Sequence, residues 1–311
     1  MPMPSKSETF AMFARYTLAN EPMLYPAIMK EVIHIESLSA MRDAGLFQRM
    51  VFQGGTAVRL CYGGIRYSED LDFSAESELS REEIALFFDR LGNSIQDLGL
   101  NLDAIKEPTM GQDRKPGDIP RWMTRIIIPP FSGTTYGVRT SHHVKIEVDA
   151  RPVHERVNRV VQVNHADLGQ IGPIVATKSI RELLADKTLA FLGRNTMKWR
   201  DVFDMYFLRN QVRGLNKEDL LSEKLRENYA DKDALENRIE IRRESLKESA
   251  NLDLLSKELT PLMPTSLRDV WLSDDGKEAL INEATITLDA LADLFDLSHN
   301  LPRGKSKSWV R

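Results

Sequence analysis

The sequence has one cysteine in 311 residues and lacks any long apolar run. Cys61 alone excludes an internal disulfide framework and a cysteine-based zinc site, and it is typical of a protein from a reducing cytoplasm. No apolar stretch approaches the roughly 18 residues that a transmembrane helix needs. The first residues lack the apolar core of a signal peptide. We therefore expect a soluble, cytoplasmic protein with no membrane partner.

The chain also lacks a strong excess of charge of either sign. It has 42 Lys and Arg residues against 46 Asp and Glu residues, and a formal net charge of −4. No global basic field indicates nucleic acid, so a polyanion would have to bind a local basic patch. Hydrophobic residues make up 42% and charged residues 28%, which is ordinary for a folded protein of about two domains.

Hydrophobic spacing predicts helices and strands in alternation through the first half of the chain. We expect helices at 10–18 and 26–44, with Gly45 as a C-cap, and a short apolar strand at 46–52. A short helix at 56–62 and a strand at 68–74 follow. Ser80 and Glu83 have the spacing of a capping box, which predicts a helix over 80–98.

In the next segment, the sequence pattern predicts a loop and three more strands, after which the pattern becomes helical. The loop covers 106–120, and the strands are 125–128, 144–150 and 159–163. We expect the first two of these strands to pair across a turn at 133–137. An apolar run at 174–176 precedes Ser179, which with Glu182 predicts a second capping box and a helix to 192. From about 180 onward the pattern is helical, including a charged stretch at 218–249 and an amphipathic one at 278–297. We expect an α/β (α+β) domain over 1–175, with a small mixed sheet flanked by helices, and a helical C-terminal domain over 176–311.

Two carboxylates lie on one face of the 68–74 strand. Side chains alternate across a strand, so Asp70 and Asp72 share a face while Leu71 and Phe73 face the core. Two adjacent ionised carboxylates repel each other unless a cation lies between them. Their hard oxygen ligands suit Mg²⁺ or Mn²⁺, which also bind substrate phosphates.

A glycine turn precedes this strand. Gly54 and Gly55 allow a close approach of the backbone to a ligand, and Thr56 offers a hydroxyl at the start of a helix whose free N–H groups can bind an anion. A glycine pair alone is more often only a tight turn. A phosphate cradle next to a carboxylate strand is the combination that phosphoryl transfer requires.

A third acid is available on the 144–150 strand. The apolar residues alternate there, so Lys145, Glu147 and Asp149 share the opposite face. Either acid could complete a metal site with Asp70 and Asp72, and an ordinary amphipathic strand would show the same pattern. We favour Glu147.

These motifs resemble the nucleotidyltransferase superfamily of the DNA polymerase β type, and more closely the AbiEii/MenT-like toxin nucleotidyltransferases. The resemblance is carried, in the family's order, by segments 52–60, 66–73, 145–149, 182–187 and 200–204. It implies the nucleotidyltransferase fold, with Asp70, Asp72 and Glu147 as metal ligands. It also implies that Lys187 and Asp204 are active-site residues, that an NTP is the nucleotide donor, and that tRNA is the acceptor in some members.

The roles of Lys187 and Asp204 can also be considered from their positions on the predicted helices. Lys187 shares a helix face with Leu183, Leu184 and Phe191, so its charge must extend to water or pair with an anion such as a triphosphate. Asp204 could pair with Arg200, or orient Lys187 or the attacking hydroxyl. For Asp201 we expect a local ion pair. We also expect Arg194, Lys198 and Arg200 to form a local basic patch for an RNA acceptor.

With these features, the resemblance implies a toxin of a toxin–antitoxin or phage-defence system. It would transfer NMP from an NTP to an RNA hydroxyl, with the tRNA 3′ end as the expected acceptor, and so block translation. Gly54, Gly55, Thr56 and Lys187 would bind the nucleotide, Mg²⁺ or Mn²⁺ would be the cofactor, and a cognate antitoxin would be the protein partner. The alternatives are transfer to a small molecule or a protein hydroxyl, and an inactive nucleotide-binding module.

Overall fold

The computed structural model describes residues 4–75, 79–109, 121–127, 141–149, 152–165, 168–212, 218–229 and 232–298. The chain divides into two compact units, one ending at Lys178 and one beginning at Ser179. The domain boundary expected at 175/176 falls inside the last strand of the first unit, β7 (Ile174–Lys178). Among the described helices, none has an apolar stretch long enough to cross a membrane.

The first unit is built on a mixed seven-stranded sheet with the strand order β3-β4-β5-β2-β1-β7-β6. Neighbours are parallel at β5/β2 and β1/β7 and antiparallel elsewhere. The strands are β1 (Met50–Gln53), β2 (Asp70–Ala75), β3 (Asn101–Thr109), β4 (Arg121–Ile127), β5 (Ser141–Asp149), β6 (Arg156–Val160) and β7. The expected mixed sheet flanked by helices is confirmed.

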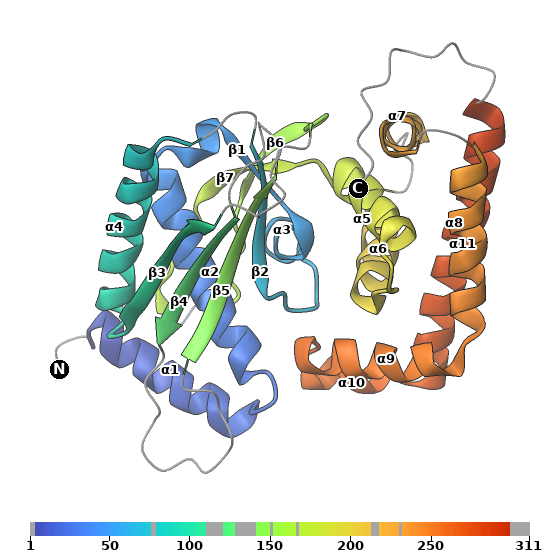
Figure 1. The fold of residues 1–311 in the computed structure, drawn as a ribbon. Helices are drawn as coiled ribbons and strands as arrows, with labels where there is room; N and C mark the ends of the chain where they lie inside the picture. Colours follow the sequence, from blue (N-terminus) through green and yellow to red (C-terminus); the bar gives the residue numbers. More distant parts are fainter. Residues whose placement is uncertain are drawn as a thin grey trace. The chain divides into compact units, whose positions relative to one another are not determined.

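The described residues of this unit form four α-helices: α1 (Lys6–Asn20), α2 (Tyr25–Asp43), α3 (Gly54–Tyr62) and α4 (Arg81–Asp97). Helices α2 and α4 cover one face of the sheet (Figure 1). That face is apolar because alternate strand residues, including Phe52, Leu71, Phe73 and Ile146, are fully buried. On β2 and β5 the opposite face carries polar side chains, among them Asp70, Asp72 and Glu147. The capping box of Ser80 and Glu83 forms at the start of α4, as expected.

Some expected boundaries are wrong. Residues 46–48 form a 3-10 turn, η1 (Leu46–Gln48), because Gly45 takes a φ of 73° and its carbonyl accepts from the Gln48 N–H. The loop expected from 106 begins too early, since β3 pairs with β4 as far as Thr109. A register shift between Lys106 and Thr109 accommodates the intervening Pro108 on this edge strand. The rest of that loop, 110–120, and the expected turn at 133–137 lie outside the described residues.

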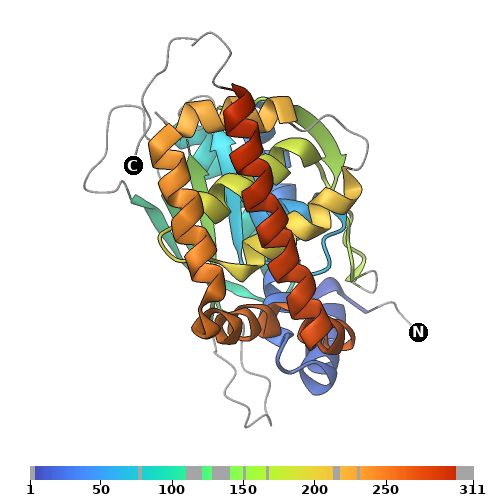
Figure 2. The same ribbon diagram turned by 90° about the vertical axis from the view of Figure 1, so that its right-hand side faces the viewer.

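The second unit is helical in its described residues, as expected. It contains α5 (Ile180–Gly193), α6 (Trp199–Gln211), α7 (Glu218–Asn228), α8 (Lys232–Lys247), α9 (Ser249–Leu259), a short turn η3 (Thr260–Leu262), α10 (Thr265–Trp271) and α11 (Asp274–Ser298). The charged stretch at 218–249 is a pair, α7 and α8, and α8 runs beside α11 (Figure 2). Buried leucines along α11, among them Leu280, Leu288 and Leu291, form the apolar stripe that its sequence indicates.

Candidate active site

The three predicted acids of the first unit lie on one face of two neighbouring strands. Strands β2 and β5 are parallel, and their register places Asp72 beside Glu147 and Asp70 beside Lys145. Directly adjacent residues on neighbouring strands share a face, so Asp70, Asp72 and Glu147 converge on the polar side of the sheet. All three side chains are partly exposed. Their carboxylate oxygens make a donor set that fits a hard divalent cation.

The register also separates the two possible third acids. Asp149 lies beside Ser74, one step further along the strands, and accepts hydrogen bonds from Ser74 Oγ at 3.0 Å and Gln53 Nε2 at 3.3 Å. Its oxygens therefore serve a side-chain network within the sheet. Glu147 lies next to Asp72 instead, which favours Glu147 as the third acid.

The electrostatics of Asp70 follow from this crowding. Burial raises the pKa of its carboxyl group above the usual value; nearby Lys145 lowers it, while Glu69 and Glu147 raise it further. Removing the carboxylate from water and placing other anions near it both disfavour its ionised form. A bound cation would reverse that balance.

The glycine turn lies directly against the acids. Gly54 has a φ of 78°, and a Cβ atom there would collide with the Asp72 carboxylate, so only glycine fits. A Cβ on Gly55 would come within 2.7 Å of Arg66 Nη2 and 2.9 Å of Ser68 Oγ. The side chain of the N-cap residue Gln53 makes no capping hydrogen bond to the first turn of α3, whose N–H groups are placed to receive an anion.

Thr56 has a different immediate role from the one its hydroxyl suggests. It is buried, and its Oγ1 donates to the main-chain carbonyl of Asp70. The hydroxyl thus ties the start of α3 to the start of β2. The group of Thr56 that remains suited to an anion is its N–H in the first turn of the helix.

A buried polar cluster that the sequence did not reveal holds the segment leading into β2. Arg59 donates from Nε to Glu31 Oε2 at 2.7 Å, donates to the Gly64 carbonyl at 3.0 Å, and lies 4.2 Å from the centre of the Tyr67 ring. Burial acts to raise the pKa of Glu31, but His165 and Arg59 outweigh it and lower the pKa to about 2. Glu31 lies far in the sequence from both Arg59 and His165, so no local pattern could have predicted this cluster.

In the second unit, Lys187 is held between two aspartates of α6. Its Nζ lies 2.9 Å from Asp201 Oδ1 and 2.8 Å from Asp204 Oδ2. Asp201 is almost fully buried and also pairs with Arg194 Nε at 3.0 Å. We expected a local ion pair for Asp201; the structure gives it two ion pairs, and they are buried and include Lys187 of the preceding helix. The missed signal was its spacing of three from Asp204, which puts both carboxylates on one side of α6.

The basic patch expected near α6 is partly used within the unit. Arg194 pairs with Asp201, and Lys198 Nζ pairs with Glu258 at 3.1 Å. Less of this patch is therefore available to a polyanion than the sequence suggested.

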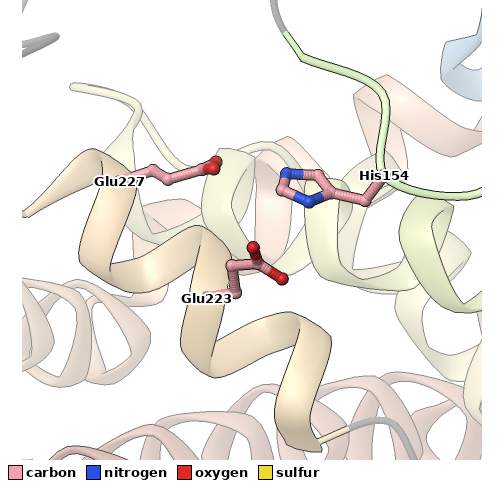
Figure 3. Close-up of side chains that lie close together, drawn as sticks. All are labelled: His154, Glu223 and Glu227. Atoms are coloured by element: carbon pink, nitrogen blue, oxygen red, sulfur yellow. The ribbon is translucent and has the colours of Figure 1, made fainter. Parts of the chain in front are cut away.

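Two further acids lie one turn apart on α7. Figure 3 shows Glu223 and Glu227 directing their carboxylates to the same side of that helix, as residues four apart do. The third labelled side chain, His154, belongs to the first unit. We therefore consider only the two glutamates, which both lie on α7. Two exposed acids on one helix are not by themselves a metal site.

A family model describes this combination of fold and motifs. The model of the nucleotidyl transferase AbiEii toxin of a type IV toxin–antitoxin system matches residues 36–275, which is 240 of the 311 residues. The chain belongs to this family of nucleotidyltransferase toxins. The match includes the glycine turn, the acids of β2 and β5, and the Lys187 cluster of α5 and α6. A nucleotidyltransferase of this family uses an NTP and has an antitoxin as its counterpart.

Solved structures from Helicobacter pylori are similar to the chain at low sequence identity. One is JHP933, with 19% identity, a TM-score of 0.41, and coverage of 88% of this chain and 95% of that one. Another is described as a candidate nucleotidyltransferase, with 20% identity, a TM-score of 0.40, and coverage of 88% and 94%. Among curated proteins, no sequence matches this chain.

Proposed function

We propose that this nucleotidyltransferase transfers NMP from an NTP to an RNA hydroxyl, with the 3′ end of tRNA as acceptor, and thereby blocks translation as a toxin. The observation that carries the proposal is the register of β2 and β5, which puts Asp72 beside Glu147 with Asp70 on the same face. Type IV toxins act within a toxin–antitoxin pair, and a role in phage defence would follow from a block of translation.

The acids of the first unit would hold Mg²⁺ or Mn²⁺. When bound, the cation supplies electrostatic stabilisation of the charge that develops on the phosphate oxygens. Gly54, Gly55 and the N–H of Thr56 bind the triphosphate, because the N-terminus of α3 presents donors and a positive dipole end. Arg66, whose guanidinium lies against Gly55, adds a positive charge to this turn.

The reaction is an in-line displacement at the α-phosphorus. The hydroxyl oxygen of the acceptor forms a bond to the α-phosphorus, the bond to the β-phosphate oxygen breaks, and pyrophosphate leaves. Glu147 accepts the hydroxyl proton. The resemblance makes Lys187 and Asp204 further active-site residues, and within the second unit Asp204 holds the Lys187 ammonium, a group that can offset phosphate charge.

A labelling experiment tests this function. The purified protein is incubated with Mg²⁺, total RNA and each of the four labelled NTPs in turn, and the products are separated on a gel. We expect label in the tRNA band, at the 3′ end, with one NTP preferred. The Asp72→Asn variant keeps the size of the side chain but loses a charge, so its transfer rate should fall at least about 100-fold.

Other outcomes would redirect the proposal. Label in protein, or in a small hydroxyl compound but not in RNA, would contradict the RNA acceptor while keeping the nucleotidyl transfer. An undiminished rate from folded Asp72→Asn would contradict the site.

A further inference from the structure

Lys145 is a cation placed among the acids of the proposed metal site. It shares the polar face of β5 with Glu147 and lies beside Asp70 in the register of β2 and β5. Its Nζ forms an ion pair with Glu147 Oε1. The metal-binding face therefore carries its own positive charge at the place where a divalent cation would sit.

The ion pair with Lys145 occupies Glu147, which is one of the proposed metal ligands. A Glu147 oxygen that binds an ammonium group cannot at the same time bind a divalent cation at full strength. Both partners remain partly exposed, with 38% of the Lys145 side chain and 27% of the Glu147 side chain accessible. Lys145 can therefore move away without opening the core.

A second lysine near Asp70 is engaged differently. Lys30 of α2 pairs with Glu69 Oε1 at 2.9 Å, and Glu69 precedes the acid strand. The two lysines thus have separate partners, and Lys145 is the one whose partner is a proposed metal ligand.

We propose that Lys145 neutralises Glu147 in the metal-free protein and is displaced when a divalent cation binds, which frees its ammonium group for the triphosphate. The inference rests on the proposed metal site. A single residue then links two events, because the metal that recruits the phosphates also releases a cation to meet them. If the pair of Lys145 and Glu147 had no such role, removing Lys145 would change neither metal binding nor triphosphate binding.

Binding of Mn²⁺ to the full chain without nucleotide tests the first half of the inference. We expect Lys145→Met to lower the Mn²⁺ dissociation constant about three- to fivefold, the range of an exposed ion pair. Lys6→Met is the matched control. Lys6 of α1 is also 38% accessible, and its ammonium group also forms an ion pair, with Glu36 of α2. This control should leave Mn²⁺ affinity unchanged. Thermal unfolding and a second variant, Lys145→Gln, establish that any change does not come from misfolding.

A double-mutant cycle tests whether Lys145 acts through Glu147. In a Glu147→Gln background, Lys145→Met should have no effect on Mn²⁺ affinity, because the acid it competes for is gone. An equal gain in both backgrounds would overturn the inference, since a general field effect would then account for it. With Mn²⁺ saturating, Lys145→Met should weaken NTP binding several-fold, opposite to its effect on the metal, and unchanged NTP binding would contradict the release of the ammonium group.

The outcomes separate this inference from the metal site on which it rests. If the wild type binds Mn²⁺, Asp72→Asn abolishes that binding and Lys145→Met changes nothing, the metal site stands and the inference is overturned. If the wild type does not bind Mn²⁺, or if Asp72→Asn binds it normally, both fail.

Discussion

At the scale of single residues, Asp201 shows how a buried charge takes its role from its partners. It is almost inaccessible, and it binds both Lys187 and Arg194. A buried carboxylate is tolerated only where cations and hydrogen bonds compensate for the water it has lost. The same contacts fix the Lys187 ammonium next to Asp204, so we infer that Asp201 positions Lys187.

The Asp201→Asn substitution tests this role. Because the amide keeps the shape of the side chain but not its charge, we expect nucleotidyl transfer to fall about tenfold or more. In a Lys187→Ala background the same substitution should cost little further activity. Asp289→Asn, in an exposed pair with Arg243 of the same unit, is the control and should leave the rate unchanged. A full additional loss in the Lys187→Ala background would show that Asp201 acts independently of Lys187.

His34 gives a prediction for the effect of pH on stability. It is fully buried, its Nε2 lies 3.1 Å from the Glu69 carbonyl, and burial lowers its pKa to about 4. In the unfolded chain it takes up a proton below its usual pKa of 6.5, whereas the folded protein resists protonation down to about 4. Protons therefore favour the unfolded state in this window, and the free energy of unfolding should fall as the pH drops from 6.5 towards 4.

Urea unfolding at several pH values between 4.5 and 7.5 measures this dependence. His34→Gln can still donate to the Glu69 carbonyl but does not titrate, so its stability should vary less with pH over this range. The Glu31 contribution, present above pH 4.5 and lost towards 2, lies below the window. Equal slopes in the wild type and His34→Gln would rule out His34 as the source.

At the scale of helices and strands, local patterns predicted those elements whose causes are local. The period of the apolar residues predicted α2, the capping box of Ser80 and Glu83 predicted α4, and alternation predicted that Asp70 and Asp72 share one face. The pairing of β4 with β5 was also expected and is confirmed. The early end of the predicted loop and the turn at Leu46–Gln48 were not foreseen, because they depend on strand pairing and on the φ of Gly45.

In the candidate site, too, the sequence predicted what depends on local spacing and missed what depends on long-range contacts. Which acids share a face could be read from the sequence, but which acid lies beside Asp72 could not, because the register of β2 against β5 joins strands some 75 residues apart. In the second unit, the sequence offered a contact between Lys187 and Asp204 as one alternative but did not reveal the contact with Asp201. Long-range pairing decides these contacts, and periodicity carries no information about it.

The turn between β1 and α3 gives a prediction at this scale. Gly54→Ala places a methyl group where the Asp72 carboxylate lies and forces a residue with a side chain into a φ of 78°. We expect a loss of Mn²⁺ binding and of transfer, with a cost in stability of about 1–2 kcal/mol from the strained backbone. Gly92→Ala on α4 is the control, because a Cβ there meets no atom within 4 Å. Normal Mn²⁺ affinity in Gly54→Ala would show that the turn and the acid are not coupled.

At the scale of the whole molecule, the family match runs across the boundary between the two units. It extends from residue 36 to residue 275, whereas the units meet between Lys178 and Ser179. The acids and the phosphate turn belong to the first unit, and Lys187 with its two aspartates belongs to the second. We infer that metal binding depends on residues of the first unit, whereas nucleotidyl transfer also depends on Lys187 of the second unit.

Two substitutions, one in each unit, separate these dependences in the full chain. Asp72→Asn should lose both Mn²⁺ binding and transfer, because it removes a proposed ligand. Lys187→Met should lose transfer by at least about 100-fold yet bind Mn²⁺ as the wild type does, since its ammonium pairs with Asp201 and Asp204 of its own unit. A loss of Mn²⁺ binding in folded Lys187→Met would contradict this separation of metal binding from transfer.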